Sequence, residues 1–198
     1  MFGCLKNFIN IIIILLAAVG FIAIGGTNLV RDLIHNPLSP AQTSKAEKAA
    51  QIADFSKLDK EFELVSSSKL PKIGNYVYVK HAATSQNFFM AKPKNTETLT
   101  KADFNSKKAD EKVMGFVKDF KVLRLENFEI TGRGSMRAFN QTVPFIKFKS
   151  DVVNLPINGA EGIVGVASKD DKNVIIVATN NYGKYSQIVT NALFSEIK

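Results

Sequence analysis

The sequence contains no tryptophan, one cysteine and two histidines among its 198 residues. The cysteine is Cys4, so no disulfide can form within the chain, and no cysteine is available to pair with a histidine in its globular part. His35 and His81 are far apart and belong to no cluster of carboxylates, which is not the pattern of a zinc site. We therefore predict no catalytic residue, no metal site and no cofactor.

Acidic residues are fewer than basic ones, 18 against 26, and the net charge is +8. A basic balance favours anionic partners such as lipid headgroups, cell-envelope polymers or nucleic acid. Basic residues alternate with Phe104, Phe116 and Phe120, as they do on some nucleic-acid surfaces. These phenylalanines fall on the apolar stripe of an expected helix, however, so we interpret them as core residues and predict no specific nucleic-acid partner.

Charged residues are missing from the run Phe8–Ile24, in which only Asn10 is strongly polar. A helix of this length spans about 25 Å, at the short end of a membrane crossing. The following residues, to Val30, extend the run at the interface. A helix that is apolar all round cannot face water, so we predict contact with a lipid bilayer through residues 8–30.

Three interpretations of this run compete. It is an uncleaved single-pass anchor with the domain outside the cytoplasm, a signal peptide cleaved before Gly26, or an anchor with the domain in the cytoplasm. Lys6 precedes the run, which slightly favours an inner N-terminus. Leu29, Val30, Leu33 and Ile34 continue the helical spacing past Gly26, which argues against cleavage. We predict the first arrangement.

The organisation predicted from these features is an N-terminal anchor at residues 1–34, a linker at 35–43 and an extracytoplasmic domain at 44–198. Pro37 and Pro40 mark the linker, because two closely spaced prolines end a helix and favour an extended path. Ser44 and Glu47 then form a capping-box pattern, and alanines at helical spacing predict a helix from Lys45 to Lys57.

Along the rest of the domain, the spacing of apolar residues alternates between the period of strands and that of helices. Alternation from Phe62, a strand at 75–81 and a run at 87–90 predict paired strands, and a second amphipathic helix is expected from Ala109 to Phe120. Further strands are expected at 121–131, 138–149, 163–168 and 174–179, with a turn at 169–172 and Pro144 at an edge or bulge. A final helical stripe consists of Tyr185, Ile188, Val189, Ala192, Leu193 and Ile197.

This order predicts an α+β fold class: an N-terminal transmembrane helix followed by an antiparallel sheet with packed helices. The paired strands 162–168 and 173–179, followed by Asn180-Asn181-Tyr182 and the final helix, resemble the C-terminus of PsbP-like proteins. The resemblance covers the last third of the chain as a pattern of periodicity. It implies an extracytoplasmic accessory domain without catalytic activity, and no functional residue of that family can be transferred.

The motif Gly132-Arg133-Gly134-Ser135-Met136-Arg137 begins like a dinucleotide-binding loop. Its sixth residue is arginine, and a strand is expected after it, so the motif lacks the required context. We interpret it as a turn between strands. The sharper hypothesis is an anion-binding site at Arg133 and Arg137, because arginine forks match phosphate and carboxylate oxygens and glycine admits close backbone approach.

The sequence therefore predicts a membrane-anchored extracytoplasmic domain with a non-enzymatic binding or accessory role. Its expected partners are the bilayer and, through the two arginines, an anionic lipid or cell-envelope polymer. The alternatives are a secreted protein with a cleaved signal, or a small carboxylate-dependent enzyme whose catalytic groups the sequence does not reveal.

Overall fold

The computed structural model describes residues 49, 51–70, 74–92, 100–112, 125–152, 159–170 and 172–198. The predicted anchor and linker lie outside these ranges. Among the helices of the described ranges, none combines the length and the apolar character needed to span a bilayer.

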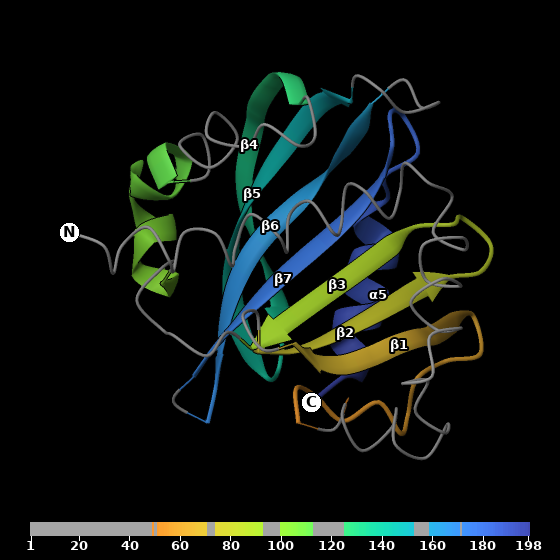
Figure 1. The fold of residues 1–198 in the computed structure, drawn as a ribbon. Helices are drawn as coiled ribbons and strands as arrows, with labels where there is room; N and C mark the ends of the chain where they lie inside the picture. Colours follow the sequence, from red (N-terminus) through yellow and green to blue (C-terminus); the bar gives the residue numbers. More distant parts are fainter. Residues whose placement is uncertain are drawn as a thin grey trace.

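Seven strands form one antiparallel sheet with the order β1-β2-β3-β7-β6-β5-β4, and helix α5 packs on one of its faces (Figure 1). The strands are β1 (Phe62–Leu70), β2 (Gly74–His81), β3 (Asn87–Lys92), β4 (Leu125–Ala138), β5 (Gln141–Val152), β6 (Ala160–Lys169) and β7 (Lys172–Asn181). The helices are the 3₁₀ helix η1 (Lys101–Asn105) and α5 (Gln187–Glu196). The predicted antiparallel sheet with packed helices is confirmed.

The last strand, β7, lies in the middle of the sheet. It pairs with β6, its hairpin partner, and with β3, so that Val177 faces Val164 on one side and Phe89 on the other. Two meanders, β1–β2–β3 and β4–β5–β6, are joined only through β7 in the strand order. The predicted hairpins around residues 169–172 and 83–86 are both confirmed.

The face of the sheet that carries α5 contains an apolar core. Alternate residues of β7, Val174, Ile176 and Ala178, are fully buried there against Leu193 and Phe194 of α5. The rings of Phe88 and Phe194 meet edge to face with centroids 6.2 Å apart. Burying each such large side chain contributes about 1.5–3 kcal/mol, so this layer fixes α5 on the sheet.

The opposite face of the central strands is buried as well. Ile175 and Val177 of β7 and Val164 and Val166 of β6 are inaccessible to solvent, as is Ile146 of β5. These strands are therefore apolar on both faces, which explains why residues 163–168 and 174–179 read as continuous β-branched runs rather than alternating ones.

The turn between β4 and β5 is not where the sequence predicted it. Residues 132–137 belong to β4, which continues to Ala138, and the chain reverses at Phe139 and Asn140. Both turn residues have positive φ, 52° and 58°, as a two-residue hairpin turn with right-handed strand twist requires. The glycine-containing motif is therefore strand and not turn.

Pro144 was expected at an edge or a bulge, but it lies within β5, between β4 and β6. It pairs with Ser135 of β4, while the pairing of β5 with β6 begins only at Phe145. The missing N–H of proline is tolerated at this position because the ladder to β6 stops before it.

Two helix predictions need correction. The first helix was predicted to reach Lys57, but residues 53–55 are not helical, because the Asp54 amide donates to the Lys198 carbonyl (2.8 Å) and its carboxylate accepts from the Ser56 amide. The C-terminal helix is confirmed, but Ile188 of its predicted apolar stripe is 82% exposed. The second helix is described only at 108–112, which are helical.

Close packing of β6 on β7 gives a test of the fold. A Cβ at Gly162 would collide with the backbone carbonyl of Ala178, whereas a Cβ at Gly132 would meet only Lys147 Cδ at 3.9 Å. We expect Gly162→Ala to lower the free energy of unfolding by about 1–3 kcal/mol. The matched control Gly132→Ala should change it by less than about 0.5 kcal/mol. Urea denaturation followed by circular dichroism measures both, and equal effects would contradict the packing.

Candidate functional site

The two arginines of the predicted anion site lie on one strand and one face. Arg133 and Arg137 are four residues apart in β4, and both pair with β5 residues of the face opposite α5. Their Cα atoms are thus about 13 Å apart, from a rise of about 3.3 Å per residue. The structure places the two guanidinium groups in different surroundings.

Arg133 holds the segment 101–112 against the sheet. Its Nη1 donates to the carbonyl oxygens of Phe104 and Ser106, both at 3.2 Å, and its Nη2 lies 2.5 Å from Asp110 Oδ1. The side chain is 36% exposed, so this ion pair is half-buried. These contacts position Phe104 and Ala109, which are buried against the sheet. The sequence did not single out Asp110, because nothing in its spacing marks it as a partner of Arg133.

Asp103 holds the two ends of the same segment together. Its carboxylate accepts hydrogen bonds from Lys112 Nζ at 2.7 Å and from the Thr100 amide at 2.8 Å. Thr100 is the N-cap of η1. Burial alone would raise the pKa of Asp103, but these donors outweigh it and the pKa is lowered. Asp103 is therefore charged and serves as a structural anchor of the segment.

Arg137 is exposed at the end of β4, and within the described ranges no side chain binds its guanidinium. Lys107 and Lys108, on the segment that Arg133 holds, are also exposed. The second half of β4 thus has three solvated cations beside it and one neutralised arginine, whereas the first half of the strand carries the exposed carboxylates Glu126 and Glu129. That Arg133 and Arg137 together bind an anion stays a prediction, and Arg137 is the one of the two that is free to do so.

The structural role of Arg133 can be measured with a double-mutant cycle. Arg133→Gln and Asp110→Asn should each lower the free energy of unfolding, and the double variant should lose less than the sum. We expect a coupling energy of about 1 kcal/mol, as for a half-buried ion pair. Arg137→Gln is the control and should be neutral. Additive effects of the first two substitutions would contradict a direct interaction.

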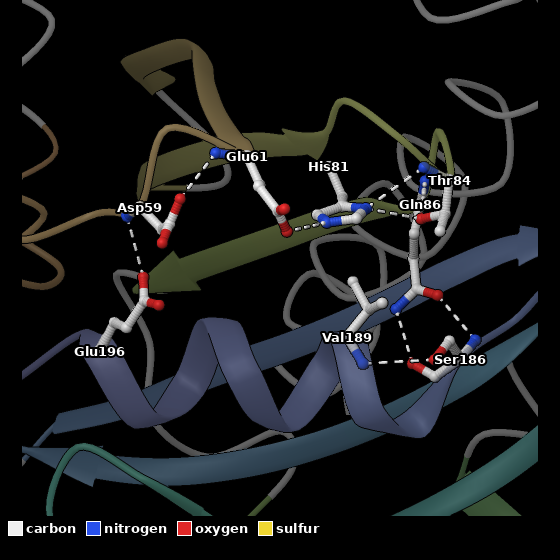
Figure 2. A network of polar contacts seen from close by, with 8 residues as sticks. All are labelled: Asp59, Glu61, His81, Thr84, Gln86, Ser186, Val189 and Glu196. Carbon is white, nitrogen blue, oxygen red and sulfur yellow. Dashed lines mark hydrogen bonds and ion pairs between the residues drawn. The ribbon is translucent and has the colours of Figure 1, made fainter.

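A second polar cluster surrounds His81, at the other end of the sheet (Figure 2). His81 is almost fully buried, and its Nδ1 accepts a hydrogen bond from the Thr84 amide at 3.2 Å. Because Nδ1 is the acceptor, the neutral ring carries its proton on Nε2 and donates it to Glu61 Oε2, also at 3.2 Å. The imidazole thereby closes the β2–β3 turn and ties it to the start of β1.

Gln86 fastens this turn to α5. Its side chain is fully buried and makes three hydrogen bonds: its amide donates to Ser186 O and Thr190 Oγ1, and its oxygen accepts from Ser186 N at 2.7 Å. Ser186 is itself the N-cap of α5 and accepts from the Val189 amide (Figure 2). At the other end of the helix, Glu196 accepts from the Asp59 amide at 3.0 Å. The helix is thus held by polar contacts at both ends.

The side chains of Thr84, His81 and Glu61 follow one another as a hydroxyl, an imidazole and a carboxylate, with Thr84 Oγ1 2.9 Å from His81 Nδ1. This order resembles that of a catalytic triad. The imidazole lone pair is, however, already used by the Thr84 amide, and Thr84 Oγ1 accepts from the Gln86 amide. We interpret the three residues as a turn-closing network and assign them no catalytic role.

A third cluster lies where β4 begins and β5 ends. Asp151 accepts hydrogen bonds from Asn127 Nδ2 and from the Tyr182 hydroxyl, both at 2.7 Å, and these bonds lower its pKa. Burial, together with the carboxylate that it faces, raises the pKa of Tyr182 well above its usual value. Over the ranges that the structure describes, no three histidine, cysteine, aspartate or glutamate side chains are grouped to hold a metal ion.

All four tyrosines of the sequence have a raised pKa, chiefly through burial, and for Tyr185 it reaches about 12. An acid whose folded pKa lies above its unfolded value of 10.0 stabilises the fold below that pH, and this contribution is lost as the pH rises through the folded values. We expect the absorbance of tyrosinate to appear at a higher pH than in unfolded protein, and together with the loss of the circular dichroism signal. With no tryptophan present, the absorbance titration is direct, and a transition at pH 10 in folded protein would contradict the burial.

Comparison with known proteins gives a likeness of fold alone. No protein-family model and no curated protein matches the sequence. Among solved structures, the fold is similar to the solution structure of cyanobacterial PsbP (CyanoP) from Synechocystis sp. PCC 6803. The two share a TM-score of 0.47 and 10% identity over 70% of this chain and 82% of that one. The resemblance predicted from the C-terminal strands and helix is confirmed at this level.

Proposed function

We propose that the protein is a non-catalytic binding or accessory domain, held at a membrane by residues 8–30 and exposed outside the cytoplasm. The observation that carries the proposal is the uncharged run Phe8–Ile24, which precedes more than 150 residues that include a sheet with its own core. A run of this kind is stable in lipid and not in water. The domain that follows is basic, which suits a surface near anionic headgroups or envelope polymers.

The described polar clusters support a binding rather than a catalytic role. His81, Gln86 and Arg133 have their hydrogen-bonding groups directed at backbone or side-chain partners of the same domain. Such groups hold turns and helix ends in place and are not poised toward a reactant. Among the described residues, exposed hydrogen-bonding groups lie at the rim of the sheet, which is where we expect a partner to bind.

The sequence offers a sharp test of the topology because Cys4 is its only cysteine and precedes the run. The variant Lys184→Cys in a Cys4→Ser background places a thiol in the exposed loop between β7 and α5. A membrane-impermeant maleimide should label this variant in intact cells. The unaltered protein should be labelled at Cys4 only after the membrane is permeabilised.

Labelling of the Lys184→Cys variant only after permeabilisation would place the domain in the cytoplasm and contradict the proposal. If the mature unaltered protein lacks Cys4, as judged by its intact mass, the run is a cleaved signal and the tether is refuted. Recovery of the protein in the membrane fraction after a carbonate wash is the companion measurement, since a tethered domain resists this extraction.

A further inference from the structure

Strand β4 is the outer strand of the sheet next to β5, and no strand of the described residues pairs with its other edge (Figure 1). Among the described residues, β5 alone pairs with it. An unpaired edge presents a row of backbone N–H and C=O groups that can accept another strand. Proteins use this property for peptide recognition by strand addition.

The open edge has one regular stretch, Gly132–Ala138. Over these seven residues β4 pairs with β5 without interruption, whereas the register shifts before Glu129 and again before Gly132. Bulges protect an edge by twisting it away from an incoming strand. The two irregularities thus protect the first half of β4 and leave the second half with a regular register. At the opposite edge of the sheet, β1 has a register shift between Leu64 and Ser66, in the middle of the strand.

The side chains of this stretch leave room for an added strand. Gly132 and Gly134 share the α5 face of β4, and Gly134 is exposed although the Phe145 ring lies against it. Thr131 and Ser135 are exposed as well, and Arg133 is partly exposed beside Asp110. The Phe145 ring is itself only 5% exposed and fills the space that a side chain at Gly134 would take, so an apolar side chain of an incoming strand can pack against its edge at Gly134, as in aromatic–aliphatic cross-strand pairs.

The charges along the stretch decide what kind of strand fits. Arg137 is solvated, and Lys107 and Lys108 are exposed on the segment that Arg133 holds. A second copy of the chain is disfavoured, because symmetric antiparallel pairing about Ser135 would set Arg133 opposite Arg137 of the other copy. Like charges directly opposite each other destabilise a pair of strands. Acidic side chains of an incoming strand, placed opposite these cations, stabilise it.

We propose that Gly132–Ala138 of β4 binds an extended acidic segment of a partner protein by strand addition. Acidic residues of the segment lie on the face of Arg137, and apolar residues alternate with them over Gly134 and Phe145. The inference deepens the proposed binding function and does not depend on the membrane tether. The labelling of Lys184→Cys reports placement alone, so either idea can fail without the other.

The test uses the full chain in non-ionic micelles and a fluorescent heptapeptide of alternating glutamate and valine, capped at both ends. Fluorescence polarisation should show saturable binding. A peptide with lysine for glutamate, and the acidic peptide N-methylated at alternate residues, should each bind at least tenfold more weakly. The first change removes charge complementarity and the second removes ladder donors. Amide exchange at 132–138 should slow when the acidic peptide is bound.

On the protein side, Arg137→Glu should weaken binding of the acidic peptide at least tenfold. Lys184→Glu makes the same charge change at the far end of the sheet and should leave the affinity within twofold. Because both side chains are exposed and neither makes a side-chain hydrogen bond within the described ranges, both variants should fold. Circular dichroism checks this.

Three outcomes would overturn the proposal. Equal binding of the N-methylated peptide shows that attraction is electrostatic only and involves no ladder. Displacement of the peptide by anionic lipid added to the micelles, at the same charge concentration, shows a headgroup surface instead. Absence of saturable peptide binding excludes strand addition, and a dimeric protein in that case points to pairing between copies.

Discussion

The sheet depends on burial of the β6–β7 hairpin on both faces. Val164 and Val177 face each other on one side of it, and Ile163 and Ala178 on the other, and all four are inaccessible to solvent. Because β7 also pairs with β3, the hairpin is the only link in the strand order between the two meanders. The pairing of β3 with β7 joins residues as distant in the chain as Asn87 and Thr179, so its loop-closure entropy must be offset by this central burial.

Polar contacts then decide how the outer layers sit on this centre. Gln86 bonds both the amide and the carbonyl of Ser186 and so fixes the start of α5 over the β2–β3 turn. Arg133 does the equivalent on the other face, where it bonds two carbonyl oxygens and Asp110 of the segment 101–112. Gln86 thus satisfies the Ser186 amide at the start of the helix, and Arg133 binds the carbonyl groups of Phe104 and Ser106, which is a common way that a helix end or a loop is held.

The same arrangement limits where a partner can bind. The central strands are covered on both faces, and the buried polar groups beside them are mostly used within the domain. Among the described residues, the outer edge of β4 pairs with no strand, and its second half has a regular register, contains glycine and is flanked by cations. Strand addition, as we propose it, uses this edge and leaves the buried centre of the sheet undisturbed.

The sequence by itself determined the elements whose signal is local. The β-branched runs of β6 and β7, the hairpin of β2 and β3 and the helix α5 were all predicted, because periodicity and turn residues lie within a few residues of each other.

The tertiary structure decided the rest. Gly132 to Arg137 has the composition of a turn, but pairing with β5 extends it into a strand and the chain reverses at Phe139 and Asn140 instead. Likewise, Arg133 changes from a candidate ligand group to a structural one only because the fold brings Asp110 beside it, and Ile188 is exposed because Thr190, Leu193 and Phe194 make up the buried side of α5. The pairing of β4 with β5 and the Arg133–Asp110 contact depend on the packing of whole elements, and no spacing along a single sequence encodes how those elements will meet.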